Sequence, residues 1–242
     1  MTTFNALLLD KREISPGVFF LTFENGKQYA LDFKAGQYVV ATIPTAQGAV
    51  KRLYSIASSP LDTSMFNLLV KRVEGGIGSV YLSELLPGKT ITLSGPAGLF
   101  SLQESPTHKV FLATGTGLAP IRSFLSTYKS MRCSLFWGVP TIEDAGFLDY
   151  FKEIRENNPL FDYYICLSRE TLETLKQAQN EVVFFPGRIN VVMELYLGPT
   201  LKGQGKNQFE YYVCGSRTVV DSLKTYLFSL GVEKSNVFFE KY

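Results

Sequence analysis

The sequence predicts a two-domain chain of β + α/β class, with an antiparallel β-barrel followed by a doubly wound parallel sheet. Its 242 residues suffice for one large domain or two modest ones. Short apolar runs separated by turn residues fill the first part, whereas from residue 109 apolar runs alternate with longer helical patterns. We therefore expect a barrel domain at residues 1–101, a linker at 102–108 and an α/β domain at 109–242.

The first half reads as a series of strands with one short helix. Residues 18–23 end at Asn25-Gly26, a dipeptide typical of hairpins, so residues 28–33 are predicted to return as a strand. A helical pattern at 79–86 stops at Pro87-Gly88. Further strands are predicted at 37–43, 66–73 and 90–93. Several strands at this spacing favour an antiparallel barrel or sandwich.

The second half alternates strands with helices. The apolar strand predicted at 109–113 is followed by a glycine turn and by a helix predicted at 120–131. The same rhythm predicts strands at 133–137, 162–167, 211–213 and 237–239 and helices at 146–157 and 218–230. Parallel strands need such crossover helices, so this half predicts a parallel sheet with helices on both faces. Residues 170–186 break the alternation and are predicted to form a loop or a short helix.

Composition excludes several functional classes. With 24 basic and 22 acidic side chains the formal charge is +2, too weak a field to favour nucleic acid or an anionic membrane. One histidine and three cysteines are too few for a Cys/His zinc site or a four-cysteine cluster. No membrane-spanning run or leader pattern is seen, so we expect a cytoplasmic protein with reduced thiols. An enzyme of this composition must work largely without imidazole, and His108 is assigned no role.

A glycine turn after the strand at 109–113 offers an anion site. Thr114, Gly115, Thr116 and Gly117 lead into a helix, where glycine backbone approaches a pyrophosphate closely and the helix N-terminus attracts its charge. Pro120 replaces the last glycine of the usual dinucleotide pattern and suits a first helical turn. The alternative is a turn that only connects strand and helix.

Two motifs of the first half point to a planar cofactor that carries phosphate. Arg52, Tyr54 and Ser55 offer a guanidinium, an aromatic face and a hydroxyl on one strand or at its end. A later turn supplies permissive backbone and a capping hydroxyl at a helix start. That turn contains Gly76, Gly78 and Ser79. A solvated strand edge and an ordinary helix cap are the alternatives.

The last two motifs lie near the C-terminus. Cys214 and Gly215 end a predicted strand, at the carboxyl edge where open α/β sheets bind ligands. A buried structural cysteine is the alternative reading. The chain ends in Glu240, Lys241 and Tyr242, which taken alone describe only a strand end that frays.

Together and in this order, the motifs resemble the ferredoxin-NADP reductase family, flavoproteins with an FAD-binding barrel followed by a pyridine-nucleotide domain. The resemblance extends over nearly the whole chain, and the change of domain falls at the predicted linker. It is carried by residues 33–38, 52–55, 75–79, 87–88, 95–100, 114–120, 168–170, 214–215 and 240–242.

The resemblance implies a set of FAD-binding residues. Arg52 would pair with the FAD pyrophosphate, Tyr54 would lie against the isoalloxazine, and Ser55 would hydrogen-bond near the flavin N5. Ser79 and the amides from Gly76 through Gly78 to Val80 would bind the flavin phosphates.

The resemblance also implies a nicotinamide nucleotide site. The turn from Thr114 to Pro120 would bind the nucleotide pyrophosphate, and Cys214-Gly215 would lie near the nicotinamide. Glu240 matches a carboxylate near both rings, and Tyr242 matches a terminal aromatic that stacks on the flavin and yields to the nicotinamide. The implied catalytic set is Ser55, Cys214, Glu240 and Tyr242.

Coenzyme choice is implied by Ser168 and Arg169, which match residues that grip the adenosine 2′-phosphate and so favour NADPH over NADH. The chain departs from many relatives at Pro140, where they have an arginine. Arg122 or Arg169 could supply the missing phosphate or ribose contact, and Arg217 could add charge nearby.

The implied activity is hydride transfer between NADPH and bound FAD, with electrons exchanged with a separate ferredoxin or flavodoxin because the family's iron–sulfur extension is absent. No histidine base or metal is required. A reductase of free flavin or quinones using NAD(P)H is the alternative within the enzyme class. A non-catalytic subunit that binds flavin or nucleotide is the alternative outside it.

Overall fold

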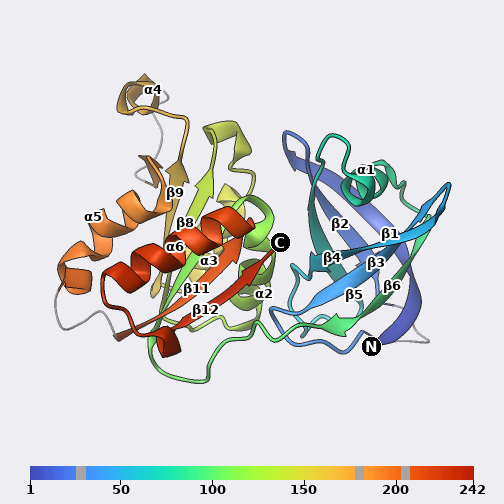
Figure 1. Cartoon of the computed structure of the whole chain (residues 1–242), viewed down its shortest axis with the longest axis horizontal. Coiled ribbons are helices and arrows are strands. Elements are labelled where there is room, and N and C mark those ends of the chain that lie inside the picture. Colours follow the sequence, from blue (N-terminus) through green and yellow to red (C-terminus); the bar gives the residue numbers. More distant parts are fainter. Residues whose placement is uncertain (26–30, 178–182, 203–207) are drawn as a thin grey trace. The chain divides into compact units, whose positions relative to one another are not determined.

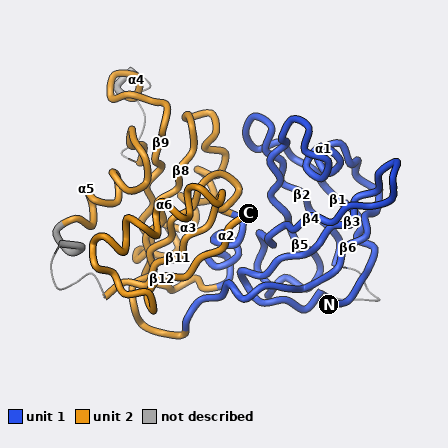
Figure 2. Tube along the Cα trace, in the orientation of Figure 1, with its two compact units in different colours: residues 1–103, 119–127 blue, residues 104–118, 128–242 orange. Residues whose placement is uncertain are grey.

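The computed structural model describes residues 1–25, 31–177, 183–202 and 208–242. By their internal contacts, residues 1–103 and 119–127 form one compact unit, and residues 104–118 and 128–242 form another (Figure 2). Helix α2 (Leu118–Thr127) therefore follows the linker in sequence but packs almost entirely with the first unit. The division of the chain at 102–108 stays a prediction.

The first unit is built on a sheet whose neighbouring strands are all antiparallel, in the order β4-β3-β6-β1-β2-β5 (Figure 1). A bridge between Ile56, just after β4, and Leu68 of β5 joins the two edge strands. The predicted antiparallel barrel is thus confirmed. Its elements are β1 (Thr2–Ser15), β2 (Val18–Glu24), β3 (Tyr38–Thr45), β4 (Gly48–Ser55), β5 (Met65–Lys71), α1 (Ile77–Glu84) and β6 (Thr90–Ala97).

Alternation along the strands builds the core of this barrel. On β3, Val39, Ala41 and Ile43 are fully buried while the residues between them are half-buried. This period of two places one face of each strand inward. Phe66, Leu68 and Val70 of β5 follow the same rule and enter the same apolar cluster.

In the first half, one predicted strand is not confirmed and one strand was missed. Of the returning strand predicted at 28–33, residues 28–30 lie outside the described residues, and residues 31–33 are not in a strand. Strand β2 pairs with β1 and β5, so neither of its edges is left for a hairpin partner. The long strand β1 was not predicted because its pairing passes from β6 to β2 with register shifts, which breaks simple alternation.

The second unit holds a parallel sheet of order β10-β9-β8-β7-β11-β12, as the strand–helix rhythm predicts (Figure 1). Its strands are β7 (His108–Thr114), β8 (Cys133–Val139), β9 (Phe161–Leu167), β10 (Phe184–Pro186), β11 (Phe209–Gly215) and β12 (Val237–Lys241). Its helices are α3 (Leu148–Asn157), α4 (Leu172–Gln177), α5 (Ile189–Lys202) and α6 (Arg217–Ser229).

Helices cover both faces of this sheet, which confirms the doubly wound prediction. Helices α5 and α6 share one apolar cluster with the strands, through residues such as Met193 and Leu223. On the opposite face Phe151 of α3 packs against Phe161 and Tyr163 of β9. Helix α5 was not predicted. The uncertain stretch at 170–186 contains α4 and β10, with residues 178–182 outside the described part.

None of the helices within the described ranges combines the length and the apolar character that crossing a membrane requires.

Candidate functional site

The first candidate site lies in the second unit, where the strand order reverses. Strand β7 has β8 on one side and β11 on the other, and this switch point is where open α/β sheets bind ligands at the carboxyl ends of their strands. The turn Thr114–Gly117 follows β7, and Cys214 and Gly215 end β11. The sheet therefore brings together two motifs that are far apart in sequence.

Two glycines allow the turn and β11 to approach each other. A Cβ on Gly117 would collide with the carbonyl group of Cys214, and one on Gly215 would collide with Oγ1 of Thr114. Gly115 has φ +50° and open space around its Cα. Glycine is favoured there by the left-handed backbone conformation and not by a close neighbour. The Nε1 of Trp137 donates to the Gly115 carbonyl at 3.0 Å and holds the turn in place.

Tyr242 lies on this turn. Strand β12 is parallel to β11, so the C-terminus emerges at the same sheet edge, where the Tyr242 amide donates to the Gly215 carbonyl. The phenol Oη donates to the Thr114 carbonyl at 3.3 Å and lies 3.1 Å from Oγ1 of Thr116. Although the residue is 61 % exposed, burial of its hydroxyl end raises its pKa. The ring thus covers the glycine turn without being enclosed.

Cys214 and Glu240 are direct partners in the β11–β12 register. Cys214 is 2 % exposed, and its burial, followed by the charge of Glu240, raises the thiol pKa well above its usual value. A thiol in this state stays protonated and is a poor nucleophile. This pair supplies a neutral thiol beside a half-buried carboxylate at the switch point.

Ser168 and Arg169 are exposed just beyond β9, at the same carboxyl edge. The Arg169 amide donates to the Pro140 carbonyl at 2.9 Å, so Pro140 still helps to shape this edge through its backbone. Arg188, which sequence analysis missed, is exposed just beyond the adjacent strand β10. A basic residue after a strand was the available signal, but β10 itself was not predicted.

The second candidate site lies in the first unit. A Cβ on Gly78, at the start of α1, would come within 2.7 Å of Cγ of Arg52 and 2.8 Å of the Tyr54 hydroxyl. The helix start therefore rests directly on the two β4 side chains that the motif singled out. Burial raises the pKa of Tyr54 to about 12, with Arg52 acting in the opposite direction. Ser55 ends the same strand, opposite Tyr38.

The Ser79 hydroxyl is not the helix cap that was predicted. Gly76 occupies the N-cap position, and no side chain caps it. The Ser79 Oγ donates to the Gly76 carbonyl and accepts from the Val73 amide, each at 3.1 Å, so it holds the glycine turn together. The first intrahelical bond runs from Val80 to Gly76, which leaves the preceding amides of the first turn without an intrahelical acceptor.

Arg122 contacts residues of the first unit. Its Nη1 donates to the Ala57 carbonyl at 2.6 Å, and its guanidinium lies 4.7 Å from the centroid of the Phe20 ring, both within the first unit. Arg217 begins α6, and its amide donates to the carbonyl of Tyr242.

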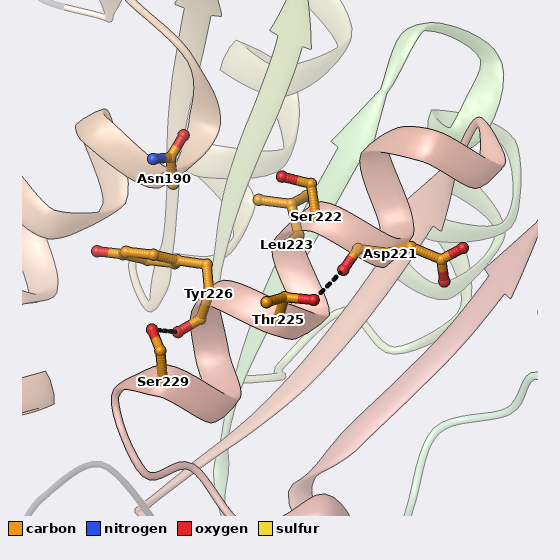
Figure 3. Close-up of a pocket in the computed structure, with 7 residues that line it drawn as sticks. All are labelled: Asn190, Asp221, Ser222, Leu223, Thr225, Tyr226 and Ser229. Atoms are coloured by element: carbon orange, nitrogen blue, oxygen red, sulfur yellow. Dashed lines mark hydrogen bonds between the residues drawn. The ribbon is translucent and has the colours of Figure 1, made fainter.

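A shallow groove of about 480 Å³ runs between α5 and α6 in the second unit (Figure 3). Two of its hydroxyls, on Thr225 and Ser229, donate to carbonyls of α6 itself. It contains no residue of either candidate site. The lining residues are Asn190, Asp221, Ser222, Leu223, Thr225, Tyr226 and Ser229.

Both sites fit the groups that their motifs imply. In the first unit the aliphatic stem of Arg52 and the Tyr54 hydroxyl lie against the helix start at Gly78, while Nη1 of Arg52 donates to the Lys51 carbonyl at 2.8 Å. A cationic side chain, a phenol and a helix start suit a planar cofactor with phosphates. In the second, a glycine turn at a switch point suits a nucleotide pyrophosphate. The chain thus provides a place for a planar cofactor with phosphates in its barrel and a place for a nucleotide at its parallel sheet.

Comparison with known proteins identifies the family. The oxidoreductase FAD-binding domain profile matches residues 5–102, and the oxidoreductase NAD-binding domain profile matches residues 111–225. Ferredoxin–NADP reductase B of Sorangium cellulosum is 41 % identical over 171 residues, which span 69 % of this chain and 70 % of that protein. The chain belongs to the ferredoxin-NADP reductase family and is a flavoenzyme that binds FAD and a nicotinamide nucleotide.

Two further similarities are more distant. The toluate 1,2-dioxygenase electron transfer component of Pseudomonas putida is 25 % identical over 246 residues, covering 99 % of this chain and 67 % of that protein. A ferredoxin NADP⁺ reductase from Neisseria gonorrhoeae, solved with bound FAD and NADP, superimposes with a TM-score of 0.81 at 18 % identity, covering 100 % and 99 % of the two chains. The second likeness supports the fold.

Proposed function

We propose that the protein transfers hydride between NADPH and bound FAD and exchanges electrons with a small carrier protein, a ferredoxin or a flavodoxin. The observation that carries this proposal is the seating of Tyr242 on the glycine turn at the switch point. Its aromatic ring lies on the turn to which we assign the nucleotide, and the hydrogen bonds that hold it there are weak enough to exchange.

In the first unit, the chain's own residues would hold and orient FAD. Arg52 supplies a fixed positive charge for the pyrophosphate, and Tyr54 supplies an aromatic face. Ser55, at the end of β4, would place its hydroxyl near the flavin N5. The amides around Gly76 and Gly78 would donate hydrogen bonds to the phosphates, while Ser79 keeps their turn in shape. When bound, FAD supplies two-electron hydride chemistry and one-electron release.

In the second unit, the residues of the switch point would bind the nucleotide. The amides of Thr114–Gly117 and the start of α2, where Pro120 suits the first turn, would receive the pyrophosphate. Cys214 and Gly215 would border the nicotinamide, and the neutral Cys214 thiol would exclude water rather than attack. Glu240, beside Cys214, would hold or pass a proton. Tyr242 must leave the turn before the nicotinamide ring can enter.

The preference for NADPH rests on the charged residues at the edge of the sheet. Ser168 and Arg169 follow β9, and Arg188 follows its neighbour β10, so a hydroxyl and two guanidinium groups sit at the carboxyl ends of adjacent strands. The 2′-phosphate of NADPH would accept hydrogen bonds from these groups, whereas NADH has no 2′-phosphate. In separate anaerobic titrations, NADPH should therefore bleach the flavin bands at a far lower concentration than NADH does.

The absorption spectrum of the purified protein, before and after anaerobic NADPH, tests the reaction class. A yellow protein whose flavin bands disappear is expected. Flavin that neither NADPH nor NADH bleaches would refute hydride transfer and leave a non-catalytic flavin-binding subunit.

The carrier is tested by steady-state reduction of cytochrome c with and without added ferredoxin or flavodoxin. The names of the Sorangium and Pseudomonas relatives support such a carrier. The charge of only +2 favours the alternative, a reductase of free flavin or quinones, because it provides no overall attraction for an acidic carrier. Activity that no carrier protein changes, together with rapid reduction of free flavin or quinone, would decide for that alternative.

A further inference from the structure

Helix α2 is fastened to the barrel just after the motif Arg52–Ser55. The Nη1 of Arg122 donates to the Ala57 carbonyl at 2.6 Å, and the Oγ of Ser123 donates to the Ser58 carbonyl at 2.6 Å. The Oγ1 of Thr127 lies 3.1 Å from the Oγ of Ser59. Three successive barrel residues are thus bound by one helix.

Apolar packing surrounds these bonds. Ser123 and Phe124 of α2 are fully buried. The Phe124 ring lies 5.5 Å from that of Phe100 and leaves no room for a side chain on Gly36. The Arg122 guanidinium also stacks over Phe20. Buried hydrogen bonds inside a close-packed contact resist local opening, so α2 and this part of the barrel should behave as one rigid body.

The barrel segment that receives α2 directly follows β4 and is hydrogen-bonded to the residue before β3 and to β5. The Ile56 amide donates to the Gln37 carbonyl, and the Ala57 amide donates to the Asn67 carbonyl. Ser58 Oγ accepts from the Asn67 amide. Segment 57–59 begins two residues after Ser55, so the docking point of α2 is fixed to the strand proposed to hold the flavin.

At its other end, α2 begins at Leu118, the residue after Gly117, with no linker between helix and turn. The helix that docks on the barrel therefore continues directly from the nucleotide turn along the chain. Hydride transfer breaks the C4–H bond of the dihydronicotinamide with its electron pair and forms the flavin N5–H bond, so NADPH is oxidised and the flavin reduced. A misplacement of about 1 Å can slow such a step about a hundred-fold.

We propose that Arg122 and Ser123 are positioning residues that couple the nucleotide turn to the flavin-binding strand through α2. This inference rests on the proposed function. It assigns these residues to the rate of flavin reduction rather than to the affinity for either ligand, because their side chains bond the Ala57 and Ser58 carbonyls of the barrel.

The test compares Ser123→Ala and Arg122→Gln with a matched control, Ser126→Ala. Within the described part of the chain, the Ser126 hydroxyl bonds to the carbonyls of Arg122 and Ser123 in α2 itself, so its loss leaves the barrel contact intact. We expect flavin reduction at saturating NADPH to slow about ten-fold in each test variant and less than about two-fold in the control. The dissociation constants for FAD and NADP⁺ should change less than about two-fold in all three.

Hydrogen exchange provides a readout that needs no turnover. Adding FAD to the wild-type apoprotein should slow exchange of the amides at 119–127, and Ser123→Ala should abolish this effect while Ser126→Ala retains it. An unchanged reduction rate in the test variants, or losses of nucleotide affinity as large as the losses of rate, would overturn the coupling.

The two proposals fail in different ways. If neither NADPH nor NADH reduces the wild-type flavin, the proposed function is wrong and hydrogen exchange alone decides the coupling. FAD-dependent protection of residues 119–127 that is lost in Ser123→Ala would then support it, and the absence of this protection in the wild type would refute it.

Discussion

The hydrogen bonds that hold Tyr242 on the glycine turn should weaken nucleotide binding, and Tyr242→Phe should relieve this competition. The substitution keeps the ring and removes only Oη, which bonds the Thr114 carbonyl at 3.3 Å and lies 3.1 Å from Oγ1 of Thr116. A nucleotide that binds the turn must break these bonds first. Weakening the contact between Tyr242 and the turn therefore tightens nucleotide binding, because less of the binding free energy is lost in displacing Tyr242.

The size of the effect follows from the geometry. A protein hydrogen bond contributes about 0.5–1.5 kcal/mol net, and these two lie at the weak end because they are long and the residue is 61 % exposed. Together they are worth about 1 kcal/mol. At about 1.4 kcal/mol per ten-fold change, the dissociation constant for NADP⁺ should fall about five-fold.

Equilibrium titration of NADP⁺, followed by calorimetry or by the flavin difference spectrum, measures this change. Tyr226→Phe is the matched control, because it removes a phenol of the same unit whose hydroxyl bonds Glu194, away from the turn. Thr116→Val should give a smaller gain than Tyr242→Phe, and the double variant should gain little beyond Tyr242→Phe. An unchanged or higher dissociation constant in Tyr242→Phe would refute the competition.

Three other substitutions test the remaining parts of the site and fold. Arg169→Ala should raise the KM for NADPH about ten-fold and that for NADH much less, because only NADPH carries a 2′-phosphate; equal effects in steady-state kinetics would remove the coenzyme assignment. Gly117→Ala should cost about 1–3 kcal/mol of stability and lower the thermal midpoint, because its Cβ meets the Cys214 carbonyl. Among the described atoms a Cβ on Gly198 of α5 meets Glu194 Cγ at 3.4 Å, an ordinary contact, so Gly198→Ala should leave the midpoint unchanged; equal midpoints in the two variants would contradict the close approach at Gly117. Burial, followed by the charge of Arg132, lowers the pKa of His108 to about 4. The free energy of unfolding is therefore at its full value above about pH 6.5, where His108 is neutral in both states, and it falls as the pH drops toward 4 because only the unfolded chain takes up the proton. Discounted for partial exposure, this loss is about 2 kcal/mol, and His108→Gln should flatten it in urea unfolding between pH 4.5 and 7.5; a wild-type loss unchanged in the variant would place the titration elsewhere.

Local patterns predicted most of the architecture. The alternation on β3 and the strand–turn–helix order at β7 each depend on neighbours in sequence, so periodicity revealed them. Elements without such a pattern were missed. Strand β1 changes partners along its length, and α5 carries an apolar run followed by Gly198 and Pro199, which obscures a helical period.

The candidate sites divide in the same way. The residue types at Arg52–Tyr54 and at the turn Thr114–Gly117 already indicated phosphate and nucleotide chemistry. The orientation of the Ser79 hydroxyl, which turns back to its own loop, depends on where Val73 lies and could not be inferred from a capping pattern. Arg188 was missed because its importance depends on β10 lying beside β9.

The sequence by itself determined which chemical groups the chain possesses and their order along it: a near-neutral protein with one histidine, an arginine–tyrosine–serine strand, two glycine turns and a terminal tyrosine. Tertiary structure alone decided that Gly117 meets Cys214, that Tyr242 reaches Thr116, and that α2 packs with the barrel rather than with the unit whose turn it extends. The physical reason is distance along the chain. Contacts between neighbours in sequence follow from local propensity, whereas these contacts exist only after strand order and helix packing have brought remote segments within a few ångströms of each other.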